Sequence, residues 1–427
     1  MAATTNLQPE PMDSIEGLGG ALPFPGPAAE FLADPYPAYD RIRAETPILT
    51  HGRATYLTRY KDIAAVLRDE RFGRARPRSG PAPQAAALAG PPAQGAARLA
   101  EMRRQSQEAP AHWVINQNPP DHARMRTMMA PAFSAAQAAR LRPTIQSAAD
   151  ALLDAVKDNG GLDIIADFAY ELPLRVISEI LGVPPADRAR LHHLARDYGL
   201  YFNLTQTPLD RERTLLARAG FSEYCRSRMA QPGQGGLGVL MNSMLDGQAA
   251  GRLSSDELLA NFAFLFIAGF ETTGTLISNG VLALLRHPDQ LRRLQENPGL
   301  IASTVEELLR YDAPTHVTPR WLLADVELAG HLFRKHELVI LMLAAANRDP
   351  EKFVEPHRLD VGRTPNPHLS FGGGSHHCMG IHPARLEAQI ALSTLVRRLP
   401  RMALIEQPLE WVSSLQVRRL KALSIRF

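Results

Sequence analysis

The chain has 427 residues, of which 45% are hydrophobic and 21% are charged. This is the profile of a globular protein that can bury a large core, as one large domain or two modest ones. The 47 Lys and Arg residues nearly balance the 44 Asp and Glu residues, and the net charge is +3. So small and dispersed a charge excludes nucleic acid as an expected partner.

The cysteines indicate a reducing compartment, and the lengths of the apolar runs indicate core segments rather than membrane spans. Cys225 and Cys378 lie far apart and match no disulfide or zinc spacing, so a cytoplasmic location is expected. The two most apolar runs, residues 262–270 and 338–346, are shorter than the roughly 20 residues needed to cross a bilayer. We therefore expect core segments and no membrane span. Residues 1–27, rich in Pro, Gly and Ala, are predicted to form a disordered tail.

The first part of the folded chain mixes extended and helical signals. Residues 55–57 are typical of a strand, and residues 61–69 place apolar side chains at helical spacing. Residues 76–95 contain five prolines among Ala and Gly, a composition that resists regular structure. Because long loops inside compact folds are often functional, we interpret this segment as a mobile lid, with an inert surface insertion as the alternative.

The later part of the chain is predicted to be mostly helical. Residues 186–230 favour two amphipathic helices separated by a turn at 205–208. Ser254 is a good N-terminal cap for a long apolar helix that runs to Arg286 and stops before Pro288. Residues 384–399 again show helical periodicity.

Residues 233–238 match the dinucleotide fingerprint G-x-G-x-x-G, but the context is wrong for that function. The segment follows an amphipathic helix and Pro232 rather than a buried strand, so we interpret it as a loop. No flavin or nicotinamide module is visible elsewhere. Any electrons that the protein uses are therefore expected to come from another protein.

The stretch 371–380, FGGGSHHCMG, is the most informative in the chain. Its three glycines permit a tight turn that can press against a flat ligand. Cys378 lies just before a predicted helix, whose N-terminus favours thiolate over thiol. An inert buried cysteine or a zinc site with nearby histidines are alternatives, although structural zinc sites normally bring paired cysteines. A serine nucleophile elbow at Ser375 fails because His377 stands where glycine is required.

This stretch resembles the haem-binding loop F-G-x-G-x-H-x-C-x-G of the cytochrome P-450 superfamily. The resemblance implies a mainly α fold with a small β lobe, with residues 28–427 as a single domain. It also implies a haem b cofactor whose iron is ligated by Cys378. In this loop the further cofactor-binding residues are Phe371, Gly372, His376 and Gly380.

A second motif, Ala268-Gly269-Phe270-Glu271-Thr272-Thr273, lies in the long apolar helix. The preceding turns are apolar nearly all round, so Glu271 is predicted to be buried rather than solvated. The motif is similar to the oxygen-binding groove A-G-x-[DE]-T-T of the same family. We expect Thr272 to bond back to the carbonyl of Ala268 and distort the helix, and Gly269 to leave space beside the iron. Glu271 and Thr272 would then relay protons to dioxygen through water.

Two further sets of charged residues match family patterns. Glu307 and Arg310 match E-x-x-R, and Arg358 is the matching third partner of a buried network on the proximal side of the haem. By the same resemblance, the haem propionates would be held by residues that are cationic or donate hydrogen bonds. These are His122, Arg126, Arg320 and His376.

The implied reaction is the insertion of one oxygen atom from O2 into an apolar organic substrate such as a polyketide or terpenoid. Electrons would pass from NAD(P)H through a ferredoxin or flavodoxin and its reductase to a monomeric enzyme. A peroxide-using or redox-neutral haem-thiolate enzyme and a non-catalytic metal-binding protein are the alternatives. By resemblance, the substrate pocket draws on mostly apolar side chains. These are Tyr198, Phe202, Phe264, Ile267, His316, Val317 and Leu415.

Overall fold

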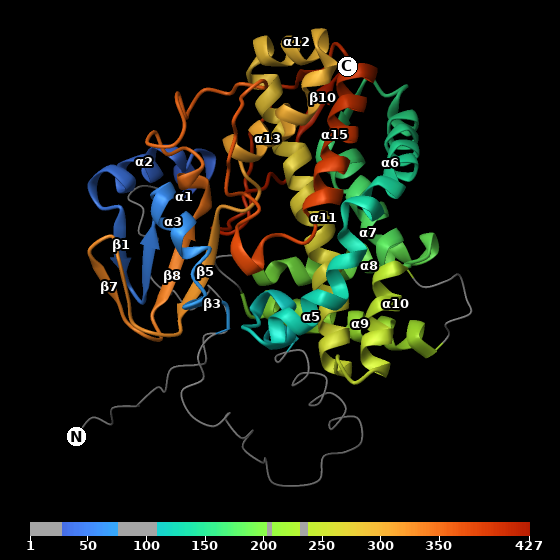
Figure 1. Ribbon diagram of the computed structural model, residues 1–427. Helices are drawn as coiled ribbons and strands as arrows, with labels where there is room; N and C mark the ends of the chain where they lie inside the picture. Colours follow the sequence, from blue (N-terminus) through green and yellow to red (C-terminus); the bar gives the residue numbers. More distant parts are fainter. Residues whose placement is uncertain (1–27, 76–108, 203–206, 231–237) are drawn as a thin grey trace, which may run out of the picture.

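The computed structural model describes residues 28–75, 109–202, 207–230 and 238–427. The predicted tail, the predicted lid and nearly all of the glycine loop at 233–238 lie outside these residues. Within them, helices form the larger part of the molecule and a small β lobe lies to one side (Figure 1). This confirms the predicted mainly α fold with a small β lobe.

The described helices range from single turns to the long central helix, and short 3-10 turns join several of them. The helices are α1 (Ala28–Ala33), α2 (Tyr36–Glu45), α3 (Tyr60–Val66), α5 (Asp121–Met129), α6 (Ala135–Val156), α7 (Glu171–Leu181), α8 (Arg188–Gly199), α9 (Pro208–Ala230), α10 (Val239–Ala249), α11 (Ser255–Arg286), α12 (Pro288–Glu296), α13 (Ile301–Tyr311), α14 (Leu343–Ala346) and α15 (Ile381–Arg398). The two amphipathic helices predicted within 186–230 are confirmed as α8 and α9.

The β lobe is a five-stranded sheet in the order β1-β2-β8-β5-β3. Among the strands of the described residues, only β2 and β8 pair in parallel, with Thr55 opposite Val339. The predicted strand at 55–57 is confirmed within β2. Smaller sheets have the orders β4-β10-β9 and β6-β7. The strands are β1 (Ile48–His51), β2 (Ala54–Leu57), β3 (Phe72–Gly73), β4 (Gly161–Asp163), β5 (Val317–Leu322), β6 (Val326–Leu328), β7 (His331–Phe333), β8 (Leu338–Met342), β9 (Ala403–Leu404) and β10 (Ser424–Arg426).

Helix α11 runs through the centre of the helical part (yellow in Figure 1). Its start is a capping box, because Ser254 Oγ accepts from the N–H of Glu257 while the Glu257 carboxylate accepts from the N–H of Ser254. The helix ends at Arg286, as predicted. It is long and apolar enough to cross a membrane, but 78% of its most apolar window is buried in the protein. A central core helix explains that composition.

Helices α7, α9 and α15 pack directly against α11. The side chains between them form the largest hydrophobic cluster, while two smaller clusters fill the β lobe. Helix α15 begins at Ile381, slightly earlier than predicted, with Gly380 as its N-cap. Pro383 is tolerated because the first turn of a helix leaves its N–H groups without intrahelical partners.

Candidate active site

The segment before α15 forms the tight glycine turn that the sequence predicted. Gly372 and Gly374 have φ angles of +68° and +65°, which favour glycine. A Cβ at Gly374 would clash with the carbonyl oxygen of Leu67, so the turn also requires close contact with the end of α3. The N–H of Cys378 donates to the carbonyl of Phe371 at 3.0 Å. These contacts hold Cys378 just ahead of α15.

The electrostatic surroundings of Cys378 differ from the prediction in one respect. Burial raises the pKa of its thiol, and this outweighs the N–H of Gly380 and the charges of Arg126 and Arg385, which lower the pKa. The N–H of Gly380 acts in the predicted direction, but the loss of water around the buried sulfur destabilises the thiolate by more than these groups stabilise it. A cation bound at the sulfur would supply the missing stabilisation.

The four predicted propionate partners lie together next to this loop. The rings of His122 and His376 are 3.8 Å apart. Burial, followed by neighbouring positive charges, lowers the pKa of His122 to about 4 and that of His376 to about 2. Arg126 Nη2 donates to the carbonyl of His377 at 2.6 Å. The charges of Arg126 and Arg320 both act on His376. Two neutral imidazoles and two guanidiniums thus lie close together beside the cysteine loop.

A buried arginine that the sequence analysis did not identify, Arg74, belongs to the same group. Within the described part of the chain, no carboxylate forms an ion pair with Arg74, Arg126 or Arg320, although Arg74 and Arg320 are only 9% and 4% exposed. Buried charges are normally paired. The donor set therefore fits a ligand that carries carboxylates, as haem does, and the adjacent Cys378 fits an iron ligand.

The predicted burial of the acid on α11 is confirmed, since Glu271 is 5% exposed. Its Oε1 lies 2.7 Å from Nη1 of Arg419, and its carboxylate lies against Gly199 of α8. Thr272 Oγ1 donates to the carbonyl of Ala268 at 2.9 Å, as predicted. However, α11 runs unbroken from Ser255 to Arg286, so the expected distortion does not interrupt the helix.

Gly269 has a packing role that the sequence did not indicate. A Cβ at this position would lie 2.7 Å from Cδ1 of Ile177 on α7. The missing side chain therefore lets α7 approach α11. The predicted role of Gly269 as a contact of the cofactor stays a prediction.

Arg419 is the second functional candidate that the sequence analysis missed. It lies close to the C-terminus, where its carbonyl accepts from the N–H of Val412 at 2.9 Å. The carbonyl of the preceding Arg418 accepts from Asn279 on α11 at 3.0 Å. Burial lowers the pKa of Arg419, but Glu271 and Tyr170 outweigh it and raise the pKa overall. No local motif marks this residue, because its role depends on contact with a distant helix.

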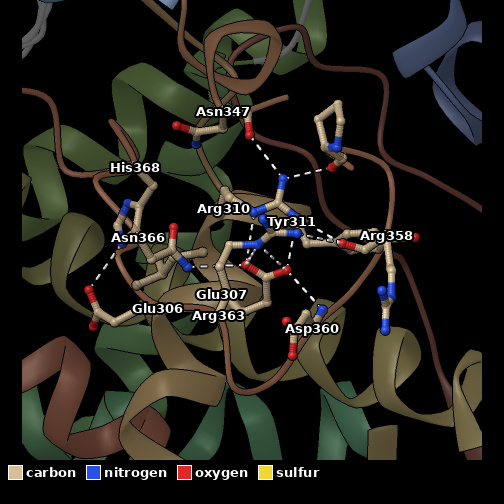
Figure 2. Close-up of polar contacts among 12 residues, drawn as sticks. Glu306, Glu307, Arg310, Tyr311, Asn347, Arg358, Asp360, Arg363, Asn366 and His368 are labelled. Carbon is tan, nitrogen blue, oxygen red and sulfur yellow. Dashed lines mark hydrogen bonds and ion pairs between the residues drawn. The ribbon is translucent and has the colours of Figure 1, made fainter. Parts of the chain in front are cut away.

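The Glu307–Arg310 network is buried as predicted, but its third partner is different (Figure 2). Both oxygens of Glu307 accept from Arg310 at 2.8 Å and from Arg363 Nε at 3.1 and 3.2 Å. The side chain of Arg358 instead pairs with Glu355 at the surface. The prediction of Arg358 is therefore wrong for its side chain, since only its carbonyl reaches Arg310. The N–H of Arg358 donates to the Glu355 carbonyl in a turn, and the Arg358 guanidinium lies at the surface.

Comparisons with known proteins decide the family. A family model described as cytochrome P-450 matches residues 227–401. The biotin biosynthesis cytochrome P-450 of Bacillus subtilis (strain 168) is 37% identical over 395 residues, which is 90% of this chain and 93% of that protein. The chain belongs to the cytochrome P-450 family.

Two further relatives extend this likeness. The cytochrome P-450 monooxygenase PikC of Streptomyces venezuelae is 36% identical and covers 93% of this chain and 92% of its own length. The crystal structure of P-450BioI with hexadec-9Z-enoic acid ligated acyl carrier protein superposes with a TM-score of 0.83 at 36% identity, covering 94% of this chain and 99% of that one. The protein is thus an oxidoreductase of the haem-dependent monooxygenase class.

In this cytochrome P-450, an aromatic cluster lies beside the first half of α11. The ring of Trp113 stacks on Phe264 at a centroid distance of 4.9 Å. Tyr198, Tyr201 and Phe202 surround the same indole at 5.9, 5.5 and 6.3 Å. Three of the predicted substrate-binding residues are therefore brought together. Ile267 belongs to the same hydrophobic cluster.

The other predicted substrate residues of this cytochrome P-450 lie in the β lobe. Val317 and Leu415 belong to a separate hydrophobic cluster. The ring of His316 is buried, bonds to the hydroxyl of Tyr39 at 2.9 Å and faces Asp312. Its role as a polar contact for substrate is therefore not supported by its side-chain contacts. The two sets are bridged where Ser414 Oγ donates to the carbonyl of Phe202 at 3.0 Å.

A zinc site gains no support from the described residues, because they contain no group of three His, Cys, Asp or Glu side chains able to hold a metal ion. Two of the histidines near Cys378 have other partners. His368 bonds to Glu306 at 3.1 Å, and His376 lies on His122.

Proposed function

We propose that Cys378 ligates the iron of haem b and that the enzyme inserts one oxygen atom from O2 into an apolar substrate. The observation that carries this proposal is the contact between the cysteine loop and the cation cluster, where Arg126 donates to the His377 carbonyl. Arg126, Arg320, His122 and His376 would hold the propionates. The bound haem, with its thiolate ligand, supplies the activation of dioxygen.

The residues on α11 would manage the protons that this reaction consumes. The Thr272 hydroxyl donates to Ala268, so its oxygen remains able to accept a hydrogen bond from water. Glu271 is the adjacent buried carboxylate, and it forms an ion pair with Arg419. We infer that Glu271 takes protons from the Arg419 side and passes them through water towards Thr272. A peroxide-using or redox-neutral enzyme has no need of this relay.

Electrons would come from NAD(P)H through a ferredoxin or flavodoxin and its reductase, in the cytoplasm, with the enzyme acting as a monomer. The absence of a recognisable flavin or nicotinamide motif in the sequence supports separate redox proteins. A spectral titration with a ferredoxin and its reductase, read as reduction of the haem, would identify the competent donor.

For the substrate we propose a medium to large apolar natural product such as a polyketide or terpenoid. The Trp113 cluster supplies apolar and aromatic surface next to α11, as such a molecule needs. Related structures were solved with epothilone D and with testosterone, and one curated relative is a vitamin D(3) 25-hydroxylase. Tyr198, Phe202, Phe264 and Ile267 would line the pocket, with Val317 and Leu415 contributing from the β lobe.

Two experiments test this function. The ferrous carbon monoxide complex should show the red-shifted Soret band of a thiolate ligand. A Soret band without this red shift would contradict the proposed ligation by Cys378. A screen of apolar compounds for substrate-induced spin-state shifts should give binders that Phe264→Ala weakens. Compounds that bind the variant with unchanged affinity would argue against the Trp113 cluster as part of the pocket.

A further inference from the structure

Two buried guanidiniums, those of Arg74 and Arg320, share the same protein acceptors. Arg74 follows β3, whose Gly73 pairs with Trp321 of β5, so Arg74 comes beside Arg320 across the two strands. Arg74 Nη1 donates to Thr318 Oγ1 at 2.5 Å and to the Pro319 carbonyl at 3.0 Å. Arg320 Nη1 donates to the same two oxygens at 3.2 and 2.8 Å. The two cations are therefore close neighbours.

This arrangement places like charges together away from water. Arg74 is 9% exposed and Arg320 is 4% exposed, and the described residues offer neither of them a carboxylate. Burial lowers the pKa of Arg74 to about 10, and burial together with Arg74 lowers that of Arg320 well below its usual range. An arginine guanidinium stays protonated in folded proteins, so both groups are cations. A pair of buried cations is unfavourable unless an anion lies beside them.

One terminal nitrogen of each guanidinium forms no hydrogen bond with the described residues. In Arg74, Nε donates to the Ile115 carbonyl and Nη1 to Thr318 and Pro319. The Nη2 atoms of Arg74 and Arg320 donate to no group in the described part of the chain. Neither atom is among the fully buried polar atoms without a hydrogen-bond partner, so each keeps some accessible surface. Both Nη2 atoms therefore face a space that water or a ligand can enter.

We propose that Arg74 is a further anchor for the haem propionates, in addition to His122, Arg126, Arg320 and His376. The inference rests on the proposed haem site. The positions matched by family resemblance supply two guanidiniums for two carboxylates, and Arg74 adds a third. The occupied site then keeps an excess positive charge at the edge of the porphyrin. This charge retains the haem more firmly and favours the ferrous state, whose net charge is more negative.

The test separates this role from a purely structural one by changing the cofactor. Holoenzymes of the wild type, Arg74→Gln and Arg74→Lys are reconstituted with iron protoporphyrin IX or with its dimethyl ester, which lacks the carboxylate charges. The rate of haem transfer to apomyoglobin is then measured. Glutamine removes the charge but can still donate from the position of Arg74 Nε, which bonds to the Ile115 carbonyl. Arg71→Gln is the matched control, since Arg71 is exposed and paired with Asp69.

With the diacid, Arg74→Gln should release haem about tenfold faster, as expected for the loss of one charge-assisted hydrogen bond. Arg74→Lys should lie closer to the wild type, and the Arg71 control should not change. With the dimethyl ester, the difference between Arg74→Gln and the wild type should vanish. The midpoint potential of the diacid enzyme should fall in Arg74→Gln.

An equal acceleration with both cofactors would show that Arg74 only supports the fold, and unchanged release and potential would show that it does not contact the propionates. Either result overturns the inference. Should Arg74→Gln fold poorly, the same two-cofactor comparison on Arg74→Met, which also removes the charge, decides it. Failure of the wild type to bind haem through a thiolate would instead refute the proposed function. The carbon monoxide spectrum measures this ligation independently of haem release.

Discussion

Arg419 Nη1 lies 2.7 Å from Oε1 of Glu271, so a residue near the C-terminus neutralises the buried acid of the central helix. The side chains of Glu271 and Arg419 are 7% and 21% exposed, which makes the pair only weakly screened by solvent. Replacement of Arg419 by Met would leave a buried carboxylate without its cation. We expect the free energy of unfolding, measured in urea, to fall by up to about 3 kcal/mol.

The double variant Glu271→Gln/Arg419→Met is the control for this prediction. With both charges gone, the loss of stability should be clearly smaller than the sum of the two single losses. Strict additivity would mean that the two side chains do not interact in solution.

Thr272→Ala should keep haem and substrate binding but divert reduced oxygen to peroxide, because the hydroxyl beside Glu271 would no longer pass protons. Product formed per NAD(P)H consumed should fall about tenfold or more. Thr127→Ala is a matched control, since Thr127 makes the same type of bond to the carbonyl four residues earlier on an exposed face of α5. An unchanged product yield in Thr272→Ala would place the relay elsewhere.

Cys378→Ser should abolish the red-shifted Soret band of the ferrous carbon monoxide complex, because a thiolate is required for that shift. Cys225→Ser should retain the band, since Cys225 is buried within α9 and burial raises the pKa of its thiol to about 12. The two variants are compared by difference spectroscopy at equal haem content. A band that survives in Cys378→Ser would refute the assignment of the ligand.

The network around Glu307 distinguishes two arginines that the sequence does not. Arg363→Met removes two hydrogen bonds to a carboxylate that is fully buried, so we expect a loss of about 2 kcal/mol in unfolding free energy. Arg358→Met should cost less than about 1 kcal/mol, because that side chain is 58% exposed and pairs at the surface. Equal losses in chemical denaturation would contradict the structure.

Glu306 should contribute to stability in mildly acidic solution. Burial alone would raise the pKa of its carboxyl, but hydrogen bonds and charges from His368 and Arg385 outweigh it and lower the pKa to about 2. The folded state therefore releases this proton more readily than the unfolded state. The contribution is present above about pH 4.5 and is lost as the pH falls towards 2.

After allowance for partial exposure, this contribution should be about 1–2 kcal/mol. Urea unfolding followed by circular dichroism from pH 7 to pH 3 measures it. Glu306→Gln should be less stable at pH 7 and should show a flatter decline below pH 4.5. A variant curve parallel to the wild type would show that Glu306 does not couple protonation to folding.

The sequence by itself determined those features that depend on neighbouring residues. The capping box at Ser254 and Glu257, the bond from Thr272 to the Ala268 carbonyl and the glycine turn before Cys378 all join groups within a few positions. Local geometry allows only a few arrangements of such groups, so the pattern of residue types was sufficient to predict them. The family motif at Cys378 then implied the chemistry.

Only the tertiary structure decided which distant charges meet. Arg74 joins Arg320 because β3 pairs with β5, and Arg419 reaches Glu271 because the C-terminal segment is bound to α11. Arg363, rather than Arg358, reaches Glu307 because the intervening turn directs one side chain inward and the other to solvent. Arg358 and Arg363 lie close together in the sequence but differ in burial and partner, and these depend on long-range packing that no local pattern encodes.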